Sequence, residues 1–142
     1  MSNEIVQYTP ENFVAEITSE NASYCSLVPK TDADKEIMFN AVNAPEHKIS
    51  DEIGEVIKVK DVFVETVETV DQKTGEMVTC PRVVLIDDKG KGHHSISKGI
   101  FSALKKLFAI YGTPDAWEKP LPIKIMQISR GANRMFTFTV VK

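Results

Sequence analysis

The residues of this sequence that could do chemistry are cations and aromatic rings rather than nucleophiles. Lys58 and Lys60 share one face of a long β-branched segment, and Arg130 and Arg134 flank a glycine-containing turn. A protein that binds a single nucleic-acid strand without reading its sequence needs cations along the phosphates and ring faces on which unpaired bases stack. The pattern therefore favours a binding surface of that kind.

The candidate contacts to such a strand are basic or aromatic residues outside the expected core: Lys58, Lys60, Phe63, Arg82, Lys91, His93, His94, Lys98, Tyr111, Trp117, Arg130 and Arg134. Several have a second interpretation. Lys58 and Lys60 could form an ordinary solvated strand face, and Phe63 could be a core residue. Tyr111 and Trp117 could stack on bases or cap the core, since each has an apolar ring with a polar edge.

Catalytic and metal-binding motifs are missing from the sequence. It has no Gly-rich phosphate loop, no HExxH and no Cys-x-x-Cys. His93 and His94 are adjacent, and neighbouring side chains on a strand face opposite sides, so the pair disfavours one shared ion even with His47 or Cys80 as further ligands. The sequence predicts a protein that is not an enzyme and uses no cofactor or metal.

Charge is unevenly distributed along the chain. The net charge is only −3, but residues 1–52 carry −7, residues 53–90 carry −3 and residues 91–142 carry +7. A chain divided in this way can turn a basic face toward a polyanion and an acidic segment elsewhere. The alternative is that the asymmetry serves solubility alone.

One helix is expected between residues 97 and 112. Its apolar residues repeat at helical spacing and form one face: Ile100, Phe101, Leu104, Leu107 and Phe108. Ser97 is the expected N-cap, Gly112 stands where a left-handed residue ends a helix, and Pro114 prevents continuation.

Most of the remaining signals indicate β-strands, expected at residues 36–42, 53–70, 77–86, 93–96, 121–128 and 135–141. The alternation of the long second segment slips in phase, which predicts a β-bulge near Lys60 and Asp61. Turns are expected at residues 71–75 and 87–92, and a hairpin at residues 129–134.

This order of elements predicts a mainly β domain at residues 31–142, a five-stranded OB-fold Greek-key barrel with one capping helix between strands 3 and 4. An α+β sandwich with the helix across one sheet fits the same order. Residues 1–30 are expected to form an arm with a short helix, which must dock on its own domain or on a neighbouring subunit to be stable. The arm residues expected to mediate self-association are apolar or aromatic: Tyr8, Phe13, Val14 and Ile17.

Cysteine use and hydropathy indicate where the protein works. The sequence has no long apolar run and no signal-peptide pattern, so a soluble, cytoplasmic protein without membrane contact is expected. Cys25 and Cys80 are then expected to be free buried thiols rather than a disulfide.

Three segments also resemble a known family: KISDEIGEVIKVKDVFVETVE, VLIDDKGKGHHSISKGIFSALKKLFAIYGTP and LPIKIMQISRGANRMFTFTVV. They are similar to single-stranded DNA-binding proteins of Gram-positive conjugative plasmids, integrative elements and phages, including an enterococcal conjugative plasmid type. The resemblance implies an OB-fold, cytoplasmic work on single strands, no cofactor, and oligomers along the strand bridged by an N-terminal tail. The chain lacks the acidic, Phe-containing tip of housekeeping bacterial single-strand binders, so recruitment of repair enzymes by that route is not expected.

The expected function is sequence-nonspecific binding of single-stranded DNA, with duplex DNA bound more weakly, and self-association through the arm. The alternative is a protein-interaction OB module in a mobile-element assembly, in which the acidic arm is the functional part and DNA is not bound.

Overall fold

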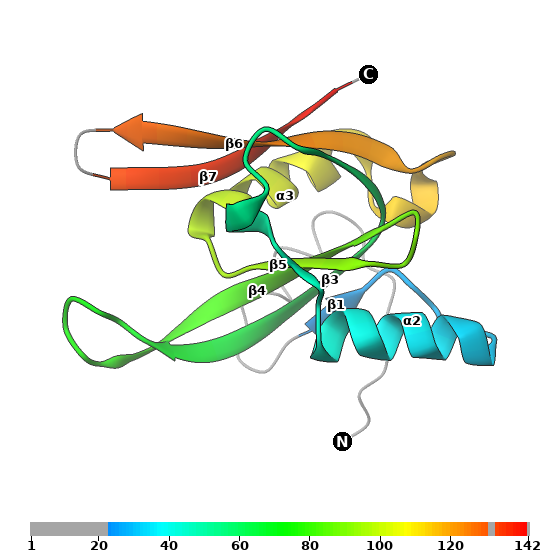
Figure 1. Cartoon of the computed structure of the whole chain (residues 1–142), viewed down its shortest axis with the longest axis horizontal. Coiled ribbons are helices and arrows are strands. Elements are labelled where there is room, and N and C mark those ends of the chain that lie inside the picture. The colour runs from blue at the N-terminus through cyan, green and yellow to red at the C-terminus, as the bar shows by residue number, and fades with distance from the viewer. Residues whose placement is uncertain (1–22, 131–132, 142) are drawn as a thin grey trace.

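The computed structural model describes residues 23–130 and 133–141, and these residues form one curled β-sheet with two α-helices (Figure 1). The elements follow in the order β1 (Ser23–Cys25), α2 (Asp32–Asn43), β2 (His47–Lys48), η1 (Ile49–Asp51), β3 (Val56–Val70), β4 (Met77–Asp87), β5 (Gly92–Ser95), α3 (Lys98–Tyr111), η2 (Pro114–Ala116), β6 (Leu121–Arg130) and β7 (Asn133–Val140). The two η elements are single turns of 3-10 helix.

The long strand β3 organises the sheet. Its first part, Val56–Val59, pairs with β6, and its remainder pairs with β4, while β1 lies antiparallel to it at residues 63–65. The β3–β4 register shifts between Val59 and Asp61, which confirms the predicted bulge and leaves Lys60 without a partner in β4. Because a bulge increases the local twist, one strand can serve both halves of a curled sheet.

The sheet is a half-barrel with an open seam. Its strands follow the order β2-β5-β4-β3-β6-β7, so β2 and β7 are the two ends of the path. Seven strands are described instead of the five expected, and α3 comes between β5 and β6 in the chain. This mainly β, curled architecture is consistent with an OB-like fold.

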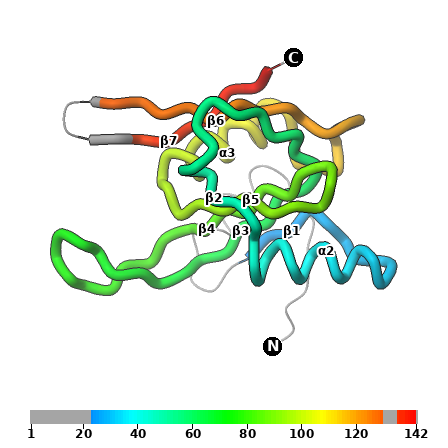
Figure 2. Tube along the Cα trace, viewed as in Figure 1, coloured from blue at the N-terminus to red at the C-terminus, as the bar shows by residue number. Residues whose placement is uncertain are grey.

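Helix α3 closes the inside of the half-barrel, as the trace in Figure 2 shows. Its predicted apolar face is entirely buried, and Leu104 and Phe108 pack among the inward side chains of β3, β4 and β6. Ser97 is the N-cap residue, but its side chain makes no capping hydrogen bond. Gly112 ends the helix with a φ of +79°, a conformation that glycine adopts without strain.

The expected strand at residues 36–42 is wrong, because this segment lies within helix α2. The hydroxyl of Thr31 accepts a hydrogen bond from the backbone N–H of Asp34 at 3.1 Å and caps the helix. Met38, Ala41 and Val42 then pack on the sheet, which is the spacing of one helical face. The consecutive apolar residues suggested a strand, but the packing partner that decides between the two structures lies on β3 and β4.

Helix α2 covers a second, smaller core on the outer face of the sheet. Phe63, Val84 and Ile86 point away from the barrel interior and are buried together with Cys25. Cys25 and Cys80 are both buried and unpaired, as the sequence predicted. Within the described residues, α2 and α3 are each too short or too polar to cross a lipid bilayer.

Candidate nucleic-acid interface

Three basic side chains gather on the outer face of β4, β5 and β2, and we call Lys48, Arg82 and His94 the basic cluster. Arg82 lies two residues before Val84, so it shares the outward face of β4. His94, on β5, is the register partner of Val84 on β4 and of Lys48 on β2, which places Arg82, His94 and Lys48 on one side of the sheet. The cluster therefore joins residues from three strands that are up to 46 positions apart in the sequence.

The pKa of His94 reflects this placement. Burial lowers the pKa of His94, and the neighbouring charges of Arg82 and Lys48 lower it further. Cationic groups held this close repel one another, and an anion bound between them relieves that repulsion and lowers the free energy of the site. The cluster is thus suited to a phosphate.

Arg82 is held in place by two contacts. Its guanidinium donates to the carbonyl oxygen of Val42 at 3.0 Å and to Glu65 Oε1 at 3.3 Å, and the ion pair with Glu65 partly neutralises its charge. Val42 lies in the last turn of α2, where carbonyl groups lack intrahelical partners and carry the negative end of the helix dipole. Helix α2, which the sequence analysis expected to be a strand, therefore positions Arg82, one of the basic residues that the same analysis identified.

A cavity of about 540 Å³ lies next to the basic cluster, at the open seam of the sheet. It is lined by residues of β2, η1, β5, β7 and the β5–α3 connection: Lys48, Ser50, His94, Ser95, Ile96, Ser97 and Phe136. We call it the seam cavity. Figure 1 shows that the β3–β4 and β6–β7 hairpins project from the same end of the molecule, with the β5–α3 connection between them.

Lys98, by contrast, is an exposed residue at the start of α3, the helix that packs on the inner face of the sheet. Its charge partly opposes the burial that raises the pKa of the Cys80 thiol on β4. The structure thus brings together two of the predicted basic residues, Arg82 and His94.

Two other predicted residues, Lys58 and Lys60, lie elsewhere. Both are exposed, near the β4–β5 turn, where the backbone N–H of Asp88 donates to the carbonyl of Lys58. Lys60 lines a small cavity of about 170 Å³ whose other charged residues are mostly acidic: Asp34, Asp61, Asp87, Asp88 and Lys89. Carboxylates in that number oppose the approach of a phosphate, so we leave Lys60 out of the interface.

His93 is buried and faces away from His94, as strand alternation requires. Its Nδ1 lies 2.7 Å from Glu52 Oε1 and its Nε2 lies 2.8 Å from Asp87 Oδ2. Burial alone would raise the pKa of Asp87, but hydrogen bonds from His93 and two backbone N–H groups lower it below its usual value. His93 therefore joins β5 to the loop before β3, and its ring nitrogens are occupied.

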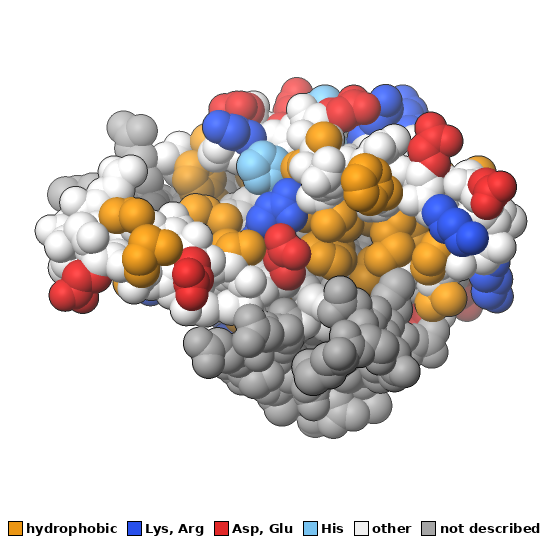
Figure 3. Space-filling model, turned by 90° about the horizontal axis from the view of Figure 1, so that it is seen from below, with side chains coloured by type: hydrophobic (Ala, Val, Ile, Leu, Met, Phe, Trp, Pro, Cys, Tyr) orange, Lys and Arg blue, Asp and Glu red, His pale blue; other side chains and the backbone are white. Residues whose placement is uncertain are grey.

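The remaining aromatic candidates divide between core and surface. Phe63 is buried under α2 and forms part of an apolar groove of about 700 Å³ between α2 and β3–β4, so the core interpretation holds. Figure 3 shows hydrophobic side chains gathered on this face beside Lys or Arg and His side chains. Trp117 is half-buried, donates from Nε1 to the carbonyl of Gly112 at 3.0 Å and packs edge-on against Phe108.

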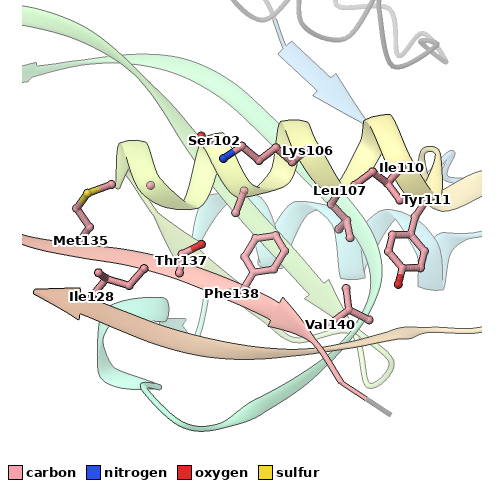
Figure 4. A pocket seen from close by; sticks show the side chains of 12 residues that line it. Ser102, Lys106, Leu107, Ile110, Tyr111, Ile128, Met135, Thr137, Phe138 and Val140 are labelled. Carbon is pink, nitrogen blue, oxygen red and sulfur yellow. The ribbon is translucent and has the colours of Figure 1, made fainter.

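Tyr111 lines a different groove, of about 360 Å³, between α3 and the β6–β7 hairpin. Figure 4 shows Tyr111, Ile110 and Lys106 on the helix side of this groove, and Met135 and Thr137 on the strand side. Its lining is mostly apolar, with Lys106 as its single charged residue. The groove is therefore better suited to an apolar group than to a phosphate.

The remaining predicted residues are Lys91, which is paired, and those whose side chains lie outside the described part of the structure. Lys91 is exposed and makes an ion pair with Glu46 at 2.9 Å, so it is partly neutralised. Arg130 and Arg134 lie on the β6–β7 hairpin, as expected, with Ser129 opposite Arg134 and Arg130 opposite Asn133. Their side chains, and the predicted arm residues Tyr8, Phe13, Val14 and Ile17, lie outside the part of the structure that is described.

Sequence reasoning missed Lys48, Ser50 and Phe136. Lys48 reaches the site through the two-residue strand β2, which pairs in parallel with β5, and no local pattern marks so short a strand. Phe136 shares strand parity with the buried Phe138, a position typical of a core residue, and it is half-buried against the main core while it also lines the seam cavity. In the described residues, no group of three or more His, Cys, Asp or Glu is arranged to hold a metal ion.

A basic cluster, hydroxyl groups and a ring beside the open seam together form a candidate binding surface. Comparison with known proteins agrees with it. The family model described as Phage Single-stranded DNA-binding protein matches residues 17–141. No curated protein and no solved structure matches the chain. Because the family match covers every described strand and helix, the chain belongs to the phage single-stranded DNA-binding protein family.

Proposed function

We propose that this protein coats single-stranded DNA without sequence preference, and protects it during plasmid conjugation or during phage or plasmid replication. Membership of the phage family supports the DNA-binding part of the proposal. The resemblance to proteins of Gram-positive mobile elements, the enterococcal conjugative plasmid type among them, supports its setting. Its mode of action is stoichiometric coverage rather than turnover, in the cytoplasm and without a cofactor.

The observation that carries the proposal is the basic cluster beside the seam cavity. Lys48 and Arg82 carry positive charge on one face, His94 can take up a proton beside them when an anion binds, and Phe136 offers a ring next to the cluster. A strand laid across β4 and β5, between the two projecting hairpins, would bring its phosphates to the cluster. Arg130 and Arg134, on the β6–β7 hairpin, then lie on the path by which the strand enters or leaves.

Titration of a fluorescent oligo(dT) at several salt concentrations tests this function. Binding is expected to be tight at low salt, and to weaken with a logarithmic slope of about −2 if three phosphates are neutralised on a single strand. Duplex DNA of the same length is expected to bind more weakly, because its stacked bases cannot reach a ring. Absence of binding to oligo(dT) at low salt would contradict the proposal.

Self-association through the N-terminal arm is part of the same proposal. Tyr8, Phe13, Val14 and Ile17 form an apolar set within an acidic segment, which suits docking on a neighbouring subunit. Because β1 begins at Ser23 and pairs with β3, a truncation must spare it.

Deletion of residues 1–20 tests the arm. The truncated protein is expected to bind a short oligonucleotide with unchanged affinity, but to lose the cooperative oligomers that the full chain forms on a long strand. Analytical ultracentrifugation with short and long oligo(dT) measures both quantities. Oligomers of unchanged size on the long strand would contradict the role of the arm.

A protein-interaction module is the second candidate, and one observation favours it. The groove between α3 and the β6–β7 hairpin is largely apolar, and several exposed hydrophobic residues surround it: Ile110, Ile128, Met135 and Val140. Exposed apolar surface of this kind often marks a protein contact. The oligo(dT) titration separates the two candidates, because the module would not bind DNA.

A further inference from the structure

The seam cavity has the size and composition of a nucleotide site. Its volume of about 540 Å³ is within the range of about 300 to 1,000 Å³ typical of pockets that hold small ligands. One part of its lining is basic or carries hydroxyl groups, contributed by Lys48, His94 and three serines. The other part is apolar, with Phe136 and Ile96. A nucleotide has the same division, with an anionic phosphate and an uncharged ring.

We infer that the seam cavity holds one nucleotide of the bound strand, with its phosphate against Lys48 and His94 and its base against the ring of Phe136. The inference rests on the proposed function and assigns a definite part of the ligand to each side of one cavity. Phe136 is half-buried and contacts the main core, so its ring is held still before the base arrives. A fixed ring face loses little conformational entropy when a base stacks on it.

The position of the cavity at the open seam explains a preference for single strands. A base can enter between β5 and β7 only if it leaves its stacked neighbours, which costs little in a single strand and several kcal/mol in a duplex. Helix α3 holds β7 at one edge of this opening, since Gly99 lies so close to β7 that an added Cβ would clash with the carbonyl oxygen of Phe136.

Binding at this site is coupled to a proton. The charged groups placed against His94 are Arg82 on β4 and Lys48 on β2, and Glu65 on β3 faces Arg82. Burial and these two cations hold the pKa of His94 below its usual value, and a phosphate would raise it by supplying the opposite charge. The bound state therefore takes up a proton that the free protein lacks, and affinity rises as the pH falls through the pKa of His94 in the complex toward its lower pKa in the free protein.

Three variants test the inference by oligo(dT) titration. Phe136→Leu keeps an apolar side chain against the core but removes the ring, and is expected to weaken oligo(dT) binding about 5- to 100-fold while changing duplex binding little. Lys48→Gln alters an exposed residue and is expected to reduce the salt slope by about 0.7. His94→Gln is expected to flatten the pH dependence of affinity.

Lys119→Gln is the matched control, because it removes one exposed lysine that lines neither the seam cavity nor the basic cluster. It also reports the general effect of losing one positive charge. If the wild-type protein binds oligo(dT) and Phe136→Leu and Lys48→Gln bind like Lys119→Gln, the site is wrong and the proposed function stands. If the wild-type protein does not bind oligo(dT), both fail. If circular dichroism shows that Phe136→Leu is unfolded, Lys48→Gln and His94→Gln still test the site, because binding by both that matches Lys119→Gln contradicts it.

Discussion

His93→Leu is expected to lower the free energy of unfolding by about 3 kcal/mol, because it leaves two carboxylates without their shared partner. Glu52 and Asp87 are both largely shielded from water, and the imidazole lies within 2.8 Å of each. Leucine has a similar volume, so the loss reflects the polar contacts more than a cavity. Urea unfolding followed by circular dichroism measures the change.

The neighbouring histidine provides the control for this variant. His94 lies on the opposite face of β5, and none of the hydrogen bonds or ion pairs found among the described residues involves its side chain. His94→Gln is therefore expected to change the free energy of unfolding by less than about 1 kcal/mol. Equal losses for His93→Leu and His94→Gln would show that the carboxylate–imidazole–carboxylate contact does not stabilise the fold.

Gly99→Ala is expected to destabilise the protein by about 3 kcal/mol, although alanine ordinarily favours a helix over glycine by about 1 kcal/mol. The added Cβ would lie 2.1 Å from the carbonyl oxygen of Phe136, and that atom belongs to the backbone of β7. To remove this clash, α3 and β7 must move apart, and that movement opens the main core. The same displacement widens the seam cavity, so weaker oligo(dT) binding is expected as well.

Ser102→Ala is the matched control on the same helix. Ser102 is half-buried on α3, one turn after Gly99, and loses only its hydroxyl group. Its free energy of unfolding is expected to change by less than about 0.5 kcal/mol. A Gly99→Ala protein as stable as the wild type, in the same urea experiment, would mean that α3 does not approach β7 as closely as described.

Helix α3 and the β-bulge in β3 could be predicted from the sequence, because each depends on residues that are close together in the chain. The apolar face of α3 repeats at helical spacing, and the phase slip around Lys60 marks the bulge, so both could be read along the chain. Helix α2 could not be separated from a strand by its short apolar run, because Met38 and Val42 become buried only by packing on Phe63 and Val84, which are distant in sequence. Tertiary packing thus overrode a weak local preference.

The proposed binding face was predictable only in part, for a similar reason. The types of residue needed for a DNA surface could be recognised, and alternation separated His93 from His94. Grouping them required the register of β2, β4 and β5, because Lys48 meets His94 only through a parallel pairing of two short strands. The lysines of the bent strand looked equivalent to Arg82 in the sequence, but the β4–β5 turn surrounds Lys60 with carboxylates.

The most direct test of the account is a nuclear magnetic resonance titration of the labelled protein with a short oligo(dT). We expect the largest amide shifts at Lys48, Ser50, His94 to Ser97, and Phe136, with smaller ones along the two hairpins. The region around Lys60 and the exposed face of α2 should change little. Shifts confined to Lys60 and the β4–β5 turn, with the residues of the seam cavity unchanged, would contradict it.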